Sequence, residues 1–387
     1  MFNIKAFCSV SLVLILISGP GSCLGIGDMS LEDRVGQLLI VGISGQELGP
    51  DTRSHLNSIR PGGIIFFKKN LGSPSKSKAF ADQLQGLAKV PLLVAVDQEG
   101  GLVNRISTSP AVPSAKNIGR ANKPALTERL GFEVGQVLLQ HGINMNLAPV
   151  LDIGDSKNAN FLKSRAYSSD PKRVTIHGVA YAKGLLRSGV LPTAKHFPGM
   201  GSVVGDPHLE GVTQTHDEKT LLNKDLLPFR YFSKLDPSAI MLSHATYTAI
   251  DKTQPAPLAP KITFELLNKA LNYKGLVITD DLMMAGTNTP SISFEEKIRK
   301  VFLGGSDMML IAWSSARQRL VKKVLVAAFK RKLLPESELN RRVAKILDVK
   351  SRIIEIKAAR NISSDPESNL KKTILELGLV RPGSADQ

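Results

Sequence analysis

Eight short apolar runs, separated by longer stretches with helical patterns, constrain the fold of this 387-residue chain more than any other feature. Most of the runs are continuously apolar, which is typical of strands that are covered on both faces. The intervals between them have room for a helix and a return loop. The runs span residues 38–42, 63–67, 92–97, 143–150, 190–196, 239–244, 275–280 and 307–311. The pattern therefore predicts an α/β fold with eight parallel strands.

Ionisable side chains stand at or just after the C-terminal ends of five of these runs. They are Asp97, Asp152, His196, His244 and Asp280. In a closed barrel these ends converge on one rim, so the side chains would face a common pocket. An open doubly wound sheet also fits the alternation of strands and helices, and scattered polar residues can be loop caps, but neither explains this convergence. We therefore predict a single (β/α)8 TIM-type barrel over residues 26–350, followed by a helical and polar C-terminal tail over residues 351–387.

The first 25 residues have the pattern of an export signal. Lys5 precedes a twelve-residue apolar run over 6–17, and a Gly-Pro-Gly sequence ends that run. A membrane-spanning helix needs about 20 apolar residues, so the run is too short to be one. We predict a signal peptide over residues 1–25 and export to the periplasm. Gly-Ser-Cys ending at Cys23 resembles the end of a bacterial lipoprotein signal, with Pro20 in place of the usual aliphatic residue, so lipidation of Cys23 and membrane anchoring stay open.

The composition excludes several chemistries. Both cysteines lie within the first 25 residues, so the rest of the chain has no thiol for a disulfide, a zinc site or a nucleophile. The sequence contains no P-loop, no His-Glu zinc-protease pair and no Gly-x-Ser-x-Gly elbow. His196, His208 and His216 lack metal-ligand spacing, so we expect no metal and no cofactor. Aromatic residues make up only 5%, which argues against a nucleic-acid-binding surface, whereas the net charge of +16 suits an anionic partner.

Four motifs carry the rest of the information. They are Val-Asp-Gln-Glu-Gly-Gly at 96–101, Lys-His-Phe-Pro-Gly-Met-Gly at 195–201, Asp-Pro-His at 206–208 and Thr-Asp-Asp-Leu-Met at 279–283. With these motifs the chain resembles the β-N-acetylglucosaminidase branch of glycoside hydrolase family 3. The resemblance runs from Val35 to Met308, and it implies a barrel of the type predicted above.

The resemblance implies a retaining mechanism with two catalytic groups. Such a mechanism needs a carboxylate below the anomeric carbon and a proton donor beside the leaving oxygen. The family pattern assigns the first role to Asp280 and the second to His208, which is paired with Asp206. A histidine suits this work because its pKa lies near working pH, and the aspartate would orient its ring. From the residues alone, Asp280 could instead cap the next helix, and His208 could be an exposed bystander.

Sugar hydroxyls require charged and planar hydrogen-bonding groups that hold the ring before chemistry begins. The resemblance assigns this work to Asp97, Arg105, Arg165, Lys195 and His196. A strand-end lysine such as Lys195 could alternatively form a Schiff base with a carbonyl substrate, as in an aldolase. We expect Asp152 and Asn146 to be structural and leave them out of the site.

Three positions depart from the family pattern. Met200 replaces a histidine, Leu102 replaces an arginine, and Pro207 replaces a serine between the two dyad residues. None of these changes removes a catalytic group. The hypothesis is a monomeric, exported, retaining exo-β-N-acetylglucosaminidase that acts on muropeptides or related aminosugar glycosides. Met200 and Pro207 motivate an alternative, a wall-binding lipoprotein with little turnover, and a β-glucosidase of the same family is a further alternative that the His-Asp loop disfavours.

Overall fold

The computed structural model describes residues 25–154, 162–203, 210–287 and 292–379. Eight parallel strands close into a barrel with the order β1-β10-β9-β7-β5-β4-β3-β2. The strands are β1 (Leu39–Gly42), β2 (Gly63–Phe66), β3 (Leu93–Val96), β4 (Met145–Asn146), β5 (Leu191–Phe197), β7 (Ala239–Leu242), β9 (Leu276–Asp281) and β10 (Met308–Ile311). Nearly all of each strand lies in one of the eight predicted runs, so the predicted TIM-type barrel is confirmed and the open sheet is excluded.

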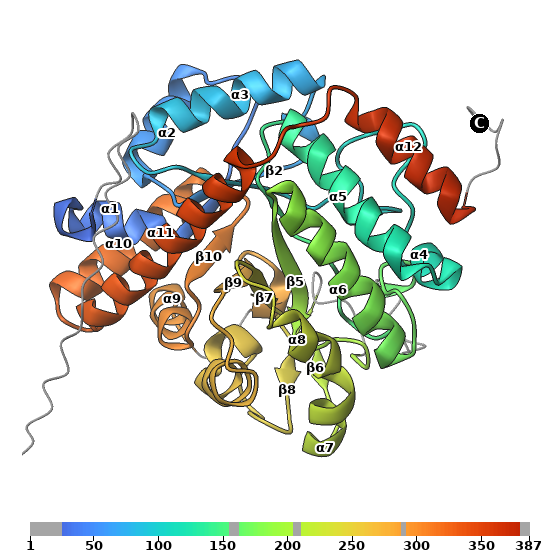
Figure 1. Ribbon diagram of the computed structural model, residues 1–387. Coiled ribbons are helices and arrows are strands. Elements are labelled where there is room, and N and C mark those ends of the chain that lie inside the picture. The colour runs from blue at the N-terminus through green and yellow to red at the C-terminus, as the bar shows by residue number, and fades with distance from the viewer. Residues whose placement is uncertain (1–24, 155–161, 204–209, 288–291, 380–387) are drawn as a thin grey trace, which may run out of the picture.

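Helices surround the barrel on the outside (Figure 1). The longer ones are α2 (Pro50–Ile59), α3 (Pro74–Leu87), α5 (Pro124–Gln140), α6 (Pro171–Ser188), η6 (Ile262–Ala270), α9 (Phe294–Leu303), α10 (Ser315–Lys330), α11 (Glu336–Ala358) and α12 (Pro366–Leu377). The shorter ones are η1 (Ile26–Asp28), α1 (Leu31–Gln37), η2 (Lys68–Asn70), α4 (Ala115–Ala121), α7 (Glu218–Thr220), η4 (Leu221–Asp225), α8 (Leu227–Phe232), η5 (Ala256–Leu258) and η7 (Ala285–Thr287). Several begin with the residues that favour a helix start. Ser73 and Asp170, for example, each accept a backbone N–H with the side chain, and a proline follows at the first helical position.

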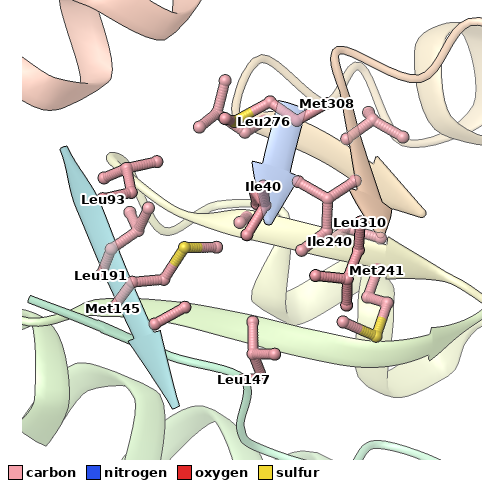
Figure 2. Close-up of a cluster of buried hydrophobic side chains, with 14 of the residues drawn as sticks. Ile40, Leu93, Met145, Leu147, Leu191, Ile240, Met241, Leu276, Met308 and Leu310 are labelled. Carbon is pink, nitrogen blue, oxygen red and sulfur yellow. The ribbon is translucent and has the colours of Figure 1, made fainter. Parts of the chain in front are cut away.

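The inside of the barrel is filled with aliphatic and methionine side chains. Ile40, Leu93, Met145, Leu191 and Met308 meet there, and each is essentially inaccessible to solvent (Figure 2). Such a core leaves no channel through the barrel, so a binding site has to lie at a rim.

The chain after residue 350 remains helical, as predicted. Helix α11 continues through the predicted division at 350 because buried Val349 and Ile353 extend its apolar face across it. Helix α12 packs against α5, on the outside of the barrel (Figure 1). The division into a catalytic domain and a tail therefore lies within a continuous helix. None of the helices in the described residues has the length and apolar content to cross a membrane.

Candidate active site

Lys195 on β5 lies at the centre of a group of buried charges at the C-terminal rim of the barrel. Its Nζ lies 2.7 Å from Oδ1 of Asp97 and 2.6 Å from Oε1 of Glu99. Burial disfavours the ammonium, but Asp97 and Glu99 raise the pKa of Lys195 above its ordinary value. Lys195 is therefore a cation at neutral pH. A protonated amine does not attack a carbonyl, so the Schiff-base alternative is not supported.

Glu99 joins Lys195 to Arg165. Two of its contacts come from Arg165, whose Nε and a terminal nitrogen donate to the two carboxylate oxygens at 2.8 and 2.9 Å. Burial alone would raise the pKa of Glu99, but Lys195 and Arg165 hold it well below its usual range. Sequence reasoning missed Glu99 as a site residue. The signal was its position two residues after Asp97, a spacing that places both side chains on one side of an extended chain.

Asp280, near the end of β9, has surroundings that keep it ionised. Burial raises the pKa of this carboxyl, but His244, His196 and Lys195 together lower it below its ordinary value. Its Oδ1 accepts a hydrogen bond from the backbone N–H of Asp281 at 2.8 Å. The site thus holds a partly accessible carboxylate beside three nitrogen-bearing side chains.

The neighbouring carboxyl of Asp281 turns to the protein, as alternation along a strand predicts. Its Oδ1 accepts from the backbone N–H groups of Met283 at 3.1 Å and Ala312 at 3.2 Å. Burial raises the pKa of Asp281 to about 6. The two adjacent aspartates therefore differ in both orientation and acidity.

Asp152 orients the ring of His196 through a hydrogen bond. The ring Nδ1 donates to Oδ2 of Asp152 at 2.6 Å, and the backbone N–H of Met200 donates to Oδ1 of the same aspartate at 2.7 Å. Asp152 is fully buried, so it has the structural role that the sequence analysis expected.

His244 is a second residue that the assigned set omitted, although its strand-end position was noted. Its Nε2 donates to the backbone carbonyl of Asp281 at 2.9 Å, and its ring interacts electrostatically with Asp280. Burial lowers the pKa of His244 despite the opposing effect of Asp280. Among the described residues, its buried Nδ1 has no hydrogen-bond partner.

Arg105 lies in the loop after β3, which Gln98 organises. Oε1 of Gln98 accepts from the backbone N–H groups of Arg105 at 2.8 Å and Ile106 at 3.0 Å. The Nε of Arg105 is buried and has no hydrogen-bond partner within the described ranges. The structure gives no direct hydrogen bond between Arg105 and the group around Lys195.

The predicted dyad, Asp206 and His208, lies outside the described residues, as does Pro207. Both flanks of segment 204–209 attach to the barrel rim. Val203 is fully buried, and beyond the segment the short strand β6 (Thr213–Gln214) pairs with β8 (Thr246–Tyr247), which follows β7. The placement of this dyad stays a prediction.

The two remaining departures from the family pattern have different environments. Met200 is buried and packs in the core, whereas Leu102 is 86% exposed in the loop after β3. Within the described part of the chain, no group of three or more His, Cys, Asp or Glu side chains is arranged to hold a metal ion.

A family model, the Glycosyl hydrolase family 3 N terminal domain, matches residues 30–349. The chain belongs to glycoside hydrolase family 3. Family membership confirms the resemblance found in the sequence.

Individual relatives agree with the family match. A beta-hexosaminidase of Tolumonas auensis is 34% identical over 278 residues, which cover 70% of this chain and 81% of that protein. Beta-hexosaminidase LpqI of Mycobacterium tuberculosis is 30% identical over 334 residues and covers 83% of each chain. A solved family 3 beta-N-acetylglucosaminidase from Paenibacillus superposes with a TM-score of 0.83 at 29% identity, over 89% of this chain and 68% of that one.

Proposed function

We propose that this family 3 chain is a retaining exo-β-N-acetylglucosaminidase that removes terminal N-acetylglucosamine from cell-wall fragments or related glycosides. At the coarser level the chain is a glycosidase of the β-N-acetylhexosaminidase class, since its family and its relatives named beta-hexosaminidase agree. One observation carries the finer proposal. Asp280 is an ionised carboxylate at the rim, beside a rigid group of buried charges that suits a sugar ring.

In the proposed first step, a carboxylate oxygen of Asp280 attacks the anomeric carbon while the bond to the aglycone oxygen breaks. His208, in its imidazolium form, gives a proton to that departing oxygen. The product is a glycosyl ester on Asp280 and a free aglycone alcohol. Attack requires the ionised form, which His244, His196 and Lys195 favour against the effect of burial.

In the proposed second step, the neutral imidazole of His208 takes a proton from water, and the resulting oxygen nucleophile attacks the anomeric carbon from the face that the aglycone left. The ester bond to Asp280 breaks, and the sugar leaves with retained configuration. Asp206 would hold the imidazole and stabilise its cation. Support for this pair is the motif at 206–208 and the attachment of both flanking segments to the rim.

The charged group around Lys195 suits recognition of sugar hydroxyls. An ammonium has three donors, and Asp97 and Glu99 accept two of them, so one remains for a hydroxyl. The guanidinium of Arg165 uses Nε and one terminal nitrogen on Glu99, which leaves its other terminal nitrogen for the ligand. Each donor is held in place before the sugar arrives, so little orientation is lost on binding.

The location of the enzyme is part of the proposal. The pattern of residues 1–25 supports export, and the strongly basic chain suits anionic muropeptides. Cell fractionation of the full chain and of Cys23→Ser tests both ideas. Export is expected for both proteins, and a membrane-bound fraction that disappears in Cys23→Ser would identify the lipidated form. Retention of both in the cytosol would contradict export.

Covalent trapping tests the mechanism. A 5-fluoro N-acetylglucosaminyl fluoride should label the native protein, and peptide mapping should place the sugar on Asp280. Asp280→Ala and His208→Ala should each lower kcat/KM on a chromogenic N-acetylglucosaminide by at least about 10³-fold. Activity that survives both substitutions would contradict the assigned roles. Faster turnover of the matching glucoside would indicate a β-glucosidase.

A further inference from the structure

The only tryptophan of the chain lies exposed at the same rim as the site. Trp313 follows β10 and keeps 46% of its surface accessible to solvent. Its ring stacks on Phe67, which follows β2, with the centroids 4.4 Å apart. The ammonium of Lys69 lies 4.4 Å from the Trp313 ring centroid. These three residues form an aromatic and cationic surface, called the Trp313 platform below.

Strand register places Phe67 beside a proposed sugar-binding residue. Phe66 pairs with Val96 in the last register position of β2 and β3, and Phe67 and Asp97 directly follow these two residues. Registered residues of parallel strands point to the same side of a sheet. Asp97 contacts Lys195 in the site, and Phe67 therefore approaches the mouth of the barrel from the adjacent strand.

The other end of the platform adjoins the nucleophile strand. The backbone N–H of Ala312 donates to Oδ1 of Asp281, which follows Asp280 directly, and Trp313 is the next residue after Ala312. The Trp313 platform thus extends between β9, which carries the proposed nucleophile Asp280, and β3, which is followed by the proposed sugar-binding residue Asp97.

Local backbone features hold the platform in position. Ser314, directly after Trp313, has a φ of 66°, a region that a residue with a Cβ seldom adopts, and its hydroxyl accepts the backbone N–H of Arg317 to begin α10. On the other side, buried Asn70 donates to the carbonyls of Ile43 at 3.0 Å and Gly45 at 2.8 Å. This brace fixes the loop that carries Phe67 and Lys69.

We propose that the Trp313 platform is the subsite for the aglycone, and that it takes a second sugar bearing a carboxylate. The inference rests on the proposed function, because an exo-acting site binds the terminal sugar in the pocket and leaves the aglycone at the mouth. The apolar face of a pyranose ring packs on an exposed indole. Lys69 contacts the indole only through a weak exposed cation-π interaction, so it yields to the ring and pairs with the carboxylate instead.

Three substrates separate this subsite from the catalytic machinery. The first is β-N-acetylglucosaminyl fluoride, whose leaving group is one atom and does not reach the Trp313 platform. The second is the neutral β-1,4 disaccharide of N-acetylglucosamine. The third is the same disaccharide with a 3-O-lactyl carboxylate on its second sugar. For each disaccharide, the informative quantity is its kcat/KM divided by that of the fluoride.

The substitutions should act differently on these two ratios. Trp313→Ala should lower both ratios about fivefold, since stacking serves any pyranose. Lys69→Ala should lower only the ratio of the charged disaccharide, by about threefold, and Lys69→Arg should restore it. Lys68→Ala is the matched control because Lys68 is an exposed neighbour of the same charge that makes no ring contact in the described residues.

The subsite would be overturned if the ratios of disaccharide to fluoride kcat/KM stay within about twofold of the native values in both Trp313→Ala and Lys69→Ala. This holds also when both variants are fully active on the fluoride. A Trp313→Ala protein that does not fold leaves the comparison of Lys69→Ala with Lys68→Ala to decide, and equal ratios there would also overturn it. A native protein that hydrolyses neither the fluoride nor a disaccharide would reject the proposed function itself, and with it the subsite.

Discussion

At the residue scale, the site depends on charges that are stable only together. The side chains of Lys195 and Glu99 are 3% and 4% exposed, so each would carry a large desolvation cost alone. Lys195 contacts Asp97 and Glu99, and Glu99 contacts Arg165, so every charge in the group has an opposite neighbour. The arrangement orients donors for a sugar, and it also makes the fold sensitive to the loss of one member.

Glu99→Gln tests this dependence. The substitution keeps the volume but leaves Lys195 and Arg165 with one fewer counter-charge, so the free energy of unfolding should fall by about 3 kcal/mol. Urea denaturation measures it. Glu265→Gln is the control, because Glu265 pairs with Lys269 on an exposed helix face and should lower stability by less than about 1 kcal/mol. Equal effects of the two substitutions would contradict the inferred role of Glu99.

The raised pKa of Asp281 predicts a pH-dependent gain from Asp281→Asn. In the unfolded chain the pKa of this carboxyl is about 3.9, whereas in the folded chain it is about 6. Because the folded value is higher, the native state loses stability as the pH rises through this interval. An asparagine keeps an oxygen for the N–H groups of Met283 and Ala312 and carries no charge.

Urea denaturation of both proteins at several pH values measures the effect. At pH 7.5 the free energy of unfolding of Asp281→Asn should exceed that of the native chain by up to about 3 kcal/mol. The difference should shrink toward pH 4. A difference that does not change with pH would mean that titration of Asp281 does not contribute.

At the element scale, the C-terminal helices belong to the packing of the barrel. Helix α12 contacts α5, and its Leu370, Ile374 and Leu377 are all buried. The continuous α11 connects this contact to the strand-helix units. We therefore expect the segment after residue 350 to unfold together with the barrel.

Ile374→Ala tests this coupling. Ile374 is fully buried, so the cavity and the lost apolar area should cost about 3 kcal/mol. Thermal unfolding followed by circular dichroism and by loss of activity should show one shared transition at a lower temperature. Ile354→Ala on α11, at a position 44% exposed, should stay within about 0.5 kcal/mol of the native value. Two separate transitions in Ile374→Ala would show that the tail unfolds independently.

At the scale of the whole molecule, the barrel brings together residues from distant parts of a chain whose net charge is +16. Asp97 directly follows β3, Lys195 lies on β5 and Asp280 on β9, and closure of the sheet places the C-terminal ends of these strands on one rim. A net positive charge attracts anionic ligands at long range, and salt screens this attraction.

Salt should therefore distinguish charged from neutral substrates. Raising sodium chloride from about 0.05 to about 0.5 M should raise KM for the lactyl-bearing disaccharide about threefold and leave KM for the neutral disaccharide nearly unchanged. Initial-rate measurements at several salt concentrations test this. An equal rise for both substrates would argue against recognition of the substrate's negative charge.

The sequence by itself predicted the eight strands and the α/β class, because continuous apolar runs are a local pattern that can be read without coordinates. The strand-end pattern identified Asp97, His196 and Asp280, and the family resemblance added Lys195, Arg105 and Arg165. Only the tertiary structure decided which charges pair, since the contact of Glu99 with Arg165 and Lys195 joins separate strand-loop units. It also decided that Trp313 stacks on Phe67 across the closed barrel, because closure makes neighbours of strands at opposite ends of the chain.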